Sequence, residues 1–156
     1  MPEFFEILKL LLSAALSSFA FSIFFCMSPK RCIPAMLGGL LAGGTYILLI
    51  RSTGQEFLSN MLAAVVATVY CEVCARVTRA PAVIYIIPAM LPLVPGGALY
   101  YTINALVSGL YSDALGFGKQ TLEIALGISC GFILTTFVDA SVKRVRKRRI
   151  ADAADT

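Results

Sequence analysis

The sequence predicts an all-α integral membrane protein with five transmembrane helices, the N-terminus outside and the C-terminus in the cytoplasm. Three observations support this fold class: an apolar composition, five long apolar segments that lack the alternation of barrel strands, and basic residues that alternate between the connections. We also expect the fourth helix to be broken by prolines near the bilayer midplane.

The composition excludes an ordinary soluble domain. Of the 156 residues, 58% are hydrophobic and 14% are charged, and the mean hydropathy is +0.84, so lipid is the main solvent. The net charge of +4 does not indicate nucleic acid, because six of the thirteen Lys and Arg residues lie at 143–149, directly after an apolar segment. Such a cluster binds anionic lipid headgroups. We therefore expect a transmembrane domain, 1–142, and a basic cytoplasmic tail, 143–156.

The apolar segments have the length of membrane crossings, since a spanning helix needs about 20 apolar residues. The five segments are 7–27, 32–50, 57–77, 82–111 and 120–140. The fourth has 30 residues, whereas two crossings and a turn would need about 40. We interpret it as one interrupted crossing.

Basic residues provide an independent test of the topology, because Lys and Arg favour the cytoplasmic side. Lys30 and Arg31 follow the first segment, Arg76 and Arg79 end the third, and the basic tail follows the fifth. The two intervening connections carry only one basic residue each. This alternation predicts the orientation stated above.

Two glycine patterns predict close contacts between helices. Gly39 and Gly43 have GxxxG spacing, as do Gly127 and Gly131, and this spacing lets helix backbones approach closely in lipid. The contacts would form within the chain or between copies in a homo-oligomer. The functional alternative is that these glycines line a pore.

The sequence offers no familiar enzymatic arrangement. The chain has no histidine to act as the base for a nucleophile, and it has no Gly-rich phosphate loop. Cys71 and Cys74 have CxxC spacing, but a second pair is missing, so a four-ligand zinc site has no source. We therefore expect no enzyme, no metal and no other cofactor.

The break in the fourth segment is the main candidate site. Pro88, Pro92 and Pro95 each remove a backbone donor and disrupt helical pairing. Pro95 lies 13 residues beyond the start of the segment, about 20 Å of helix. A second half-helix starting at Pro95, Gly96 and Gly97 would present unpaired N–H groups to a carboxylate, while carbonyl groups freed upstream would accept from an ammonium group or a coupling cation.

Polar residues continue from this break at helical spacing. Gly97, Tyr101, Asn104 and Ser108 form one stripe, with Tyr100 beside it, and such a stripe should avoid lipid. The alternative is a proline kink in which the polar side chains form hydrogen bonds between helices. The candidate substrate-binding residues are Pro88, Pro92, Pro95, Gly96, Gly97, Tyr100, Tyr101 and Asn104.

The third segment carries candidate ion-coupling residues, Glu72 and Arg76, four residues apart on one helical face. Ionisable residues at such depth are functional candidates, although an ion pair at the membrane boundary is the alternative explanation. Lys9, Glu123 and Asp139 lie near segment ends, and we interpret them as boundary residues.

The stretch RAPAVIYIIP at 79–88, continuing through PLVPG at 92–96 to Tyr100, resembles the signature of the threonine/serine exporter family. It is similar in particular to the small five-helix component, which occurs in that family as the C-terminal half of a ten-helix protein or as a separate subunit. The residues that match the motif are Pro81, Pro88, Pro92, Pro95, Gly96 and Tyr100.

This resemblance implies export of threonine, serine or related small carboxylates across the bacterial cytoplasmic membrane, driven by the proton motive force. It also implies a partner, the larger five-helix subunit of the same exporter, in addition to membrane lipid and an amino-acid or small-carboxylate substrate. The alternative is a structural membrane subunit that assembles or stabilises a partner transporter without binding substrate.

Overall fold

The computed structural model describes the backbone of residues 2–154 and the side chains of residues 4–141 and of Arg144. The described chain is helical throughout, with no strand. Its elements are α1 (Pro2–Phe24), α2 (Pro29–Thr53), α3 (Glu56–Thr78), α4 (Val83–Met90), the short 3₁₀ helix η1 (Leu91–Leu93), α5 (Gly96–Val107) and α6 (Tyr111–Ala154).

Four helices of the described chain are long and apolar enough to cross a membrane: α1, α2, α3 and α6. The helical stretch Val83–Leu93, which comprises α4 and η1, meets α5 at a bend of 50°. If this stretch and α5 together form one span, they make a fifth crossing. The predicted membrane-helical class is therefore confirmed, with four to five candidate spans.

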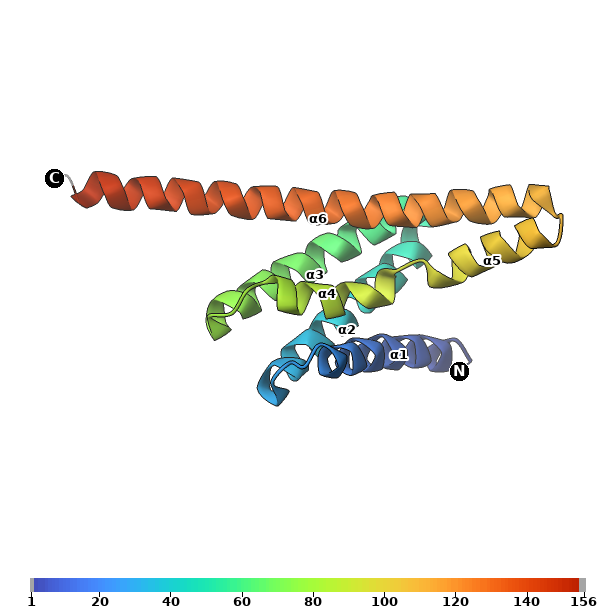
Figure 1. Ribbon diagram of the computed structural model, residues 1–156, viewed down its shortest axis with the longest axis horizontal. Helices are drawn as coiled ribbons and strands as arrows, with labels where there is room; N and C mark the ends of the chain where they lie inside the picture. The colour runs from blue at the N-terminus through green and yellow to red at the C-terminus, as the bar shows by residue number, and fades with distance from the viewer. Residues whose placement is uncertain (1, 155–156) are drawn as a thin grey trace.

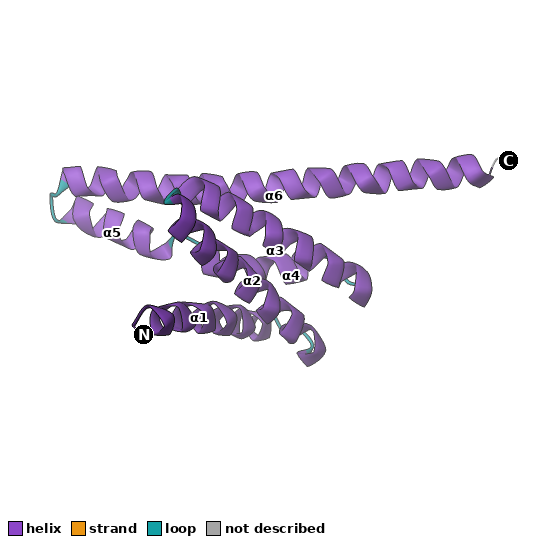
Figure 2. Cartoon of the chain, turned by 180° about the vertical axis from the view of Figure 1, so that it is seen from behind, coloured by secondary structure: helices purple, strands orange, loops and turns teal. Residues whose placement is uncertain are grey.

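The helices form a bundle whose connections lie at two ends (Figure 1). The α1–α2 and α3–α4 connections lie at one end, and the α2–α3 and α5–α6 connections lie at the other, as the view from behind also shows (Figure 2). Helix α6 packs along α3 and α5, and α2 lies between α1 and α3. The C-terminal part of α6, which includes the basic tail, extends past the α1–α2 end (Figure 1).

Helix α6 begins at Tyr111, nine residues before the apolar segment 120–140 that the sequence indicates. The cause is the tight end of α5. Gly109 has a left-handed φ of 75°, its N–H donates to the Leu106 carbonyl, and the Leu110 N–H donates to the Ala105 carbonyl. This is the hydrogen-bond pattern of a Schellman motif, so the chain reverses at once and a new helix starts.

Close contacts at glycine hold the bundle together. A Cβ atom added to Gly39 would lie 1.8 Å from Ser18 Oγ on α1, and one added to Gly131 would lie 2.4 Å from the Met61 carbonyl oxygen on α3. Gly43 and Gly127 are also in close contact with α1 and α3, respectively. The packing role predicted for the GxxxG patterns is confirmed within the chain.

Candidate functional site

The backbone leaves helical geometry at Val94 and Pro95. The chain remains helical through Pro88 and tightens into η1 at Leu91. Val94 then has an extended ψ of 129°, and Pro95 caps α5. The disruption that the sequence predicts at three prolines is therefore concentrated in two residues, and Pro88 is buried inside α4.

The start of α5 has backbone donors without partners. The N–H of Gly96 donates to the Val94 carbonyl at 2.7 Å, across an inverse γ-turn centred on Pro95. The N–H of Leu99 donates to the Pro95 carbonyl. Within the described chain, the N–H groups of Gly97 and Ala98 have no backbone acceptor. These two donors are the ones that α5 presents to a ligand.

A cavity of about 580 Å³ lies against this start of α5. Its polar side chains are Tyr46 from α2, Asn60 from α3, Tyr101 from α5 and Gln120 from α6. A Cβ added at Gly96 or Gly97 would have no atom within 4 Å, so both glycines open onto free space. The lining residues are Leu10, Tyr46, Asn60, Pro92, Leu93, Val94, Pro95, Gly96, Gly97, Ala98, Tyr101, Phe117, Gln120 and Ile124.

Of the eight predicted substrate-binding residues, the structure brings five to this cavity and leaves three outside its lining. Pro92, Pro95, Gly96, Gly97 and Tyr101 line it. Pro88 is buried in the helix core, while Tyr100 and Asn104 are exposed. The Tyr101 ring lies 5.5 Å from that of Phe117 on α6 and 5.5 Å from that of Tyr100.

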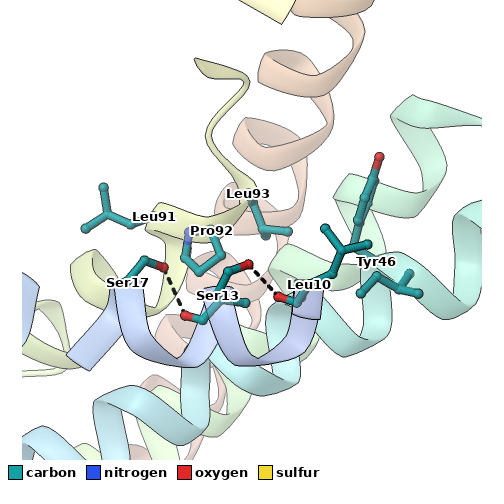
Figure 3. A pocket seen from close by; sticks show the side chains of 10 residues that line it. Leu10, Ser13, Ser17, Tyr46, Leu91, Pro92 and Leu93 are labelled. Atoms are coloured by element: carbon teal, nitrogen blue, oxygen red, sulfur yellow. Dashed lines mark hydrogen bonds between the residues drawn. The ribbon is translucent and has the colours of Figure 1, made fainter. Parts of the chain in front are cut away.

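A second cavity of about 370 Å³ adjoins the first and lies between α1, α2 and η1. Both cavities are lined by Leu10, Tyr46, Pro92 and Leu93. Figure 3 shows Ser13 and Ser17 bonded to carbonyl groups of their own helix, at 2.8 and 3.0 Å. These hydroxyl donors are therefore already used, and the open space continues from the break towards α1 along a largely apolar wall.

Sequence reasoning did not identify the polar group around Glu56. Its carboxylate accepts from Tyr46 Oη at 3.1 Å and from Gln120 Nε2 at 3.0 Å. Asn60 Nδ2 donates to the Glu56 carbonyl at 2.8 Å and approaches its carboxylate at 3.5 Å. Glu56 thus connects three of the side chains that line the cavity. The only local signal was the four-residue spacing of Glu56 and Asn60, which places them on one helical face.

The predicted ion-coupling pair lies at the other end of α3. Arg76 Nη2 is 3.4 Å from Glu72 Oε2, and it also forms an ion pair with Asp139 of α6. The Glu72 and Asp139 side chains are only 11% and 8% exposed, whereas that of Arg76 is 57% exposed. Asp139, which we interpreted as a boundary residue, therefore belongs with Glu72 and Arg76 to an ion cluster that joins α3 to α6.

The long apolar helices define the class of a helical membrane protein, and a cavity lies at the start of α5. The chain belongs to the threonine/serine exporter family: the family model described as Threonine/Serine exporter, ThrE matches residues 10–138. This confirms the resemblance found in the sequence, and the matched range contains the cavity and nearly all of α1 to α5. No curated protein and no solved structure was found that matches the chain.

Proposed function

We propose that this chain is the small subunit of a secondary exporter in the bacterial cytoplasmic membrane. The exporter uses the proton motive force to carry threonine, serine or related small carboxylates outward, and a larger five-helix subunit of the same family supplies its other half. Family membership supports a role as an exporter component. The partner is supported by the small number of spans, because many carriers consist of two related halves around a shared site.

The carboxylate group of the substrate binds at the start of α5. The observation that carries this proposal is the pair of unpartnered N–H groups, at Gly97 and Ala98, beside a glycine that opens onto a cavity. A helix N-terminus favours a negative charge by about 0.3–1 kcal/mol, and by more where water is excluded. Gly97 has no side chain to keep a ligand away from the backbone.

The helix lengths support one broken crossing with its break near the midplane. Residues 83–93 form 11 residues of helix and α5 forms 12, which correspond to about 16 and 18 Å. Each piece matches about half of a 30 Å hydrocarbon layer. In the proposed orientation, the N-terminus is outside and the α1–α2 connection, the α3–α4 connection and the tail are cytoplasmic, where Lys and Arg are favoured.

The ion cluster supports proton coupling at the cytoplasmic end. Glu72 and Asp139 are two poorly exposed carboxylates that share Arg76. Protonation of Glu72 would remove one charge from this group and weaken the contact of Arg76 with its own helix. Two cavities, of about 200 and 280 Å³, adjoin Glu72 and Arg76, and they give water a route to the cluster.

The test of the proposed function is to fill the cavity while monitoring assembly. We expect Gly97→Leu to abolish serine and threonine export without loss of the protein or of the subunits that co-purify with it. The matched control is Gly116→Leu on α6, where an added Cβ also meets no atom within 4 Å. Unchanged export by Gly97→Leu would instead favour the structural subunit that binds no substrate.

A further inference from the structure

Glu56 determines how two amide side chains are oriented beside the cavity, that of Asn60 mainly through its backbone carbonyl and that of Gln120 through its carboxylate. An ionised carboxylate only accepts hydrogen bonds, so the atoms of Asn60 and Gln120 that face it are their amide nitrogens. Their contacts are 2.8 Å from Asn60 Nδ2 to the Glu56 carbonyl and 3.0 Å from Gln120 Nε2 to Glu56 Oε1. Because the nitrogen and oxygen of an amide point in different directions, both side-chain oxygens are turned away from Glu56.

These two oxygens have no partner within the described chain. The side-chain hydrogen bonds of Asn60 and Gln120 all use nitrogen. Asn60 is 2% exposed, yet Ser18 Oγ is the only described side-chain oxygen or nitrogen that is both fully buried and without a partner. The Asn60 oxygen therefore keeps a small accessible surface within an almost fully buried side chain. The open space that both residues line is the cavity at the start of α5.

We propose that the side-chain oxygens of Asn60 and Gln120, held in place by Glu56, bind the ammonium group of an amino-acid substrate. This inference rests on the proposed function, and it assigns the part of the same site that binds the positively charged end of the substrate. The two parts of the site match the two charged groups of an amino acid: Gly97 and Ala98 provide donors for the carboxylate, whereas the amides provide acceptors for the ammonium. Glu56 adds a nearby negative charge without lining the cavity itself, so it acts as a positioning residue.

The same oxygens have the chemistry to hold a coupling metal cation, since carbonyl oxygens also bind hard cations. An ammonium subsite makes a prediction that a cation site does not. It separates L-serine from glycerate, which has the same carboxylate and side chain but a hydroxyl in place of the ammonium. A hydrogen bond to a charged group corresponds to a preference of about tenfold to hundredfold.

The experiment uses the full-length chain, with whatever subunits co-purify, reconstituted in liposomes, and it measures the transport of L-serine and of glycerate. The wild type should prefer serine. We expect Gln120→Leu to lower the ratio of serine to glycerate transport about tenfold to hundredfold, mainly through the loss of serine transport. Glu123→Gln is the matched control, because Glu123 pairs with the exposed Lys119 on the same helix, and it should leave the ratio unchanged.

A paired exchange keeps the test informative if Gln120→Leu misfolds. In Glu56→Gln combined with Gln120→Glu, the amide nitrogen at position 56 donates to the new carboxylate, whose second oxygen remains free to accept from an ammonium. This double variant should show the same preference for serine over glycerate as the wild type.

Two results would overturn the assignment: a wild type without preference, or a ratio unchanged by Gln120→Leu, including the case expected for a cation site, in which serine and glycerate transport fall together. A wild type that co-purifies with a larger subunit and still transports neither compound would instead refute the proposed function, and the ammonium assignment with it.

Discussion

The packing of α3 against α6 should be sensitive to a single methyl group at Gly131. In Gly131→Ala, the new Cβ would lie 2.4 Å from the Met61 carbonyl oxygen and 2.9 Å from Ala64 Cβ, whereas ordinary contacts begin at 3.4 Å. Backbone atoms on both sides leave no flexible group to move, so the helices must separate by about 1 Å. Overpacking of this kind costs about 1–3 kcal/mol.

Gly116 provides the matched control because it lies on the same helix and an added Cβ there meets no atom within 4 Å. Both variants gain the preference of alanine over glycine in a helix, about 1 kcal/mol, so this gain cancels when they are compared. The free energy of unfolding of Gly131→Ala should therefore be lower than that of Gly116→Ala by about 2 kcal/mol. For a chain of this size, that difference corresponds to about 4–8 °C in Tm.

Thermal unfolding of both purified variants in detergent measures this difference. A 1 Å separation would also lengthen the 3.0 Å contact between Glu56 and Gln120, so Gly131→Ala should lose part of its serine transport as well. Equal Tm values for the two variants would refute the close packing of α3 and α6.

Four further predictions concern the topology and the ion cluster. Cys26 is exposed in the α1–α2 connection, so a membrane-impermeant maleimide should label it only after cells are permeabilised, and labelling of intact cells would reverse the proposed orientation. Arg76→Gln removes a cation that two poorly exposed carboxylates share and should destabilise the protein by about 2 kcal/mol in chemical unfolding, about half the cost for a fully buried pair. Asp139→Asn, which keeps the pair of Arg76 with Glu72, should cost about 1 kcal/mol, and equal losses would argue against a shared cluster. Glu72→Gln should remove the dependence of serine transport on an imposed proton gradient, and an unchanged dependence excludes the coupling role.

Local features predicted the helical class of the fold and the start of a helix at Gly96. The apolar segments have the length that lipid requires, and Pro95 followed by Gly96 and Gly97 carries a backbone signal that does not depend on neighbouring helices. Pro88 shows the limit of this reasoning, since this proline is accommodated in the last turn of the short helix α4, inside the bundle.

The contacts between helices were harder to predict. Tyr46, Glu56 and Gln120 belong to three different helices, and periodicity along one helix does not show which neighbour its polar face meets. In lipid the outer surface is as apolar as the interior, so hydrophobicity does not separate buried faces from exposed ones. Asp139 was missed as a partner of Arg76 for the same reason, because the two are 63 residues apart in sequence.

The most direct test of the central claim is whether substrate protects Gly97 from chemical modification. In a variant whose native cysteines are replaced by serine, Gly97→Cys should react with a small maleimide, and L-serine or L-threonine should slow that reaction. Gly116→Cys is the control, because it lies outside the cavity lining and also faces open space. Protection at position 97 alone is the result that a substrate site at the start of α5 predicts. Equal labelling rates at position 97 with and without substrate would contradict it.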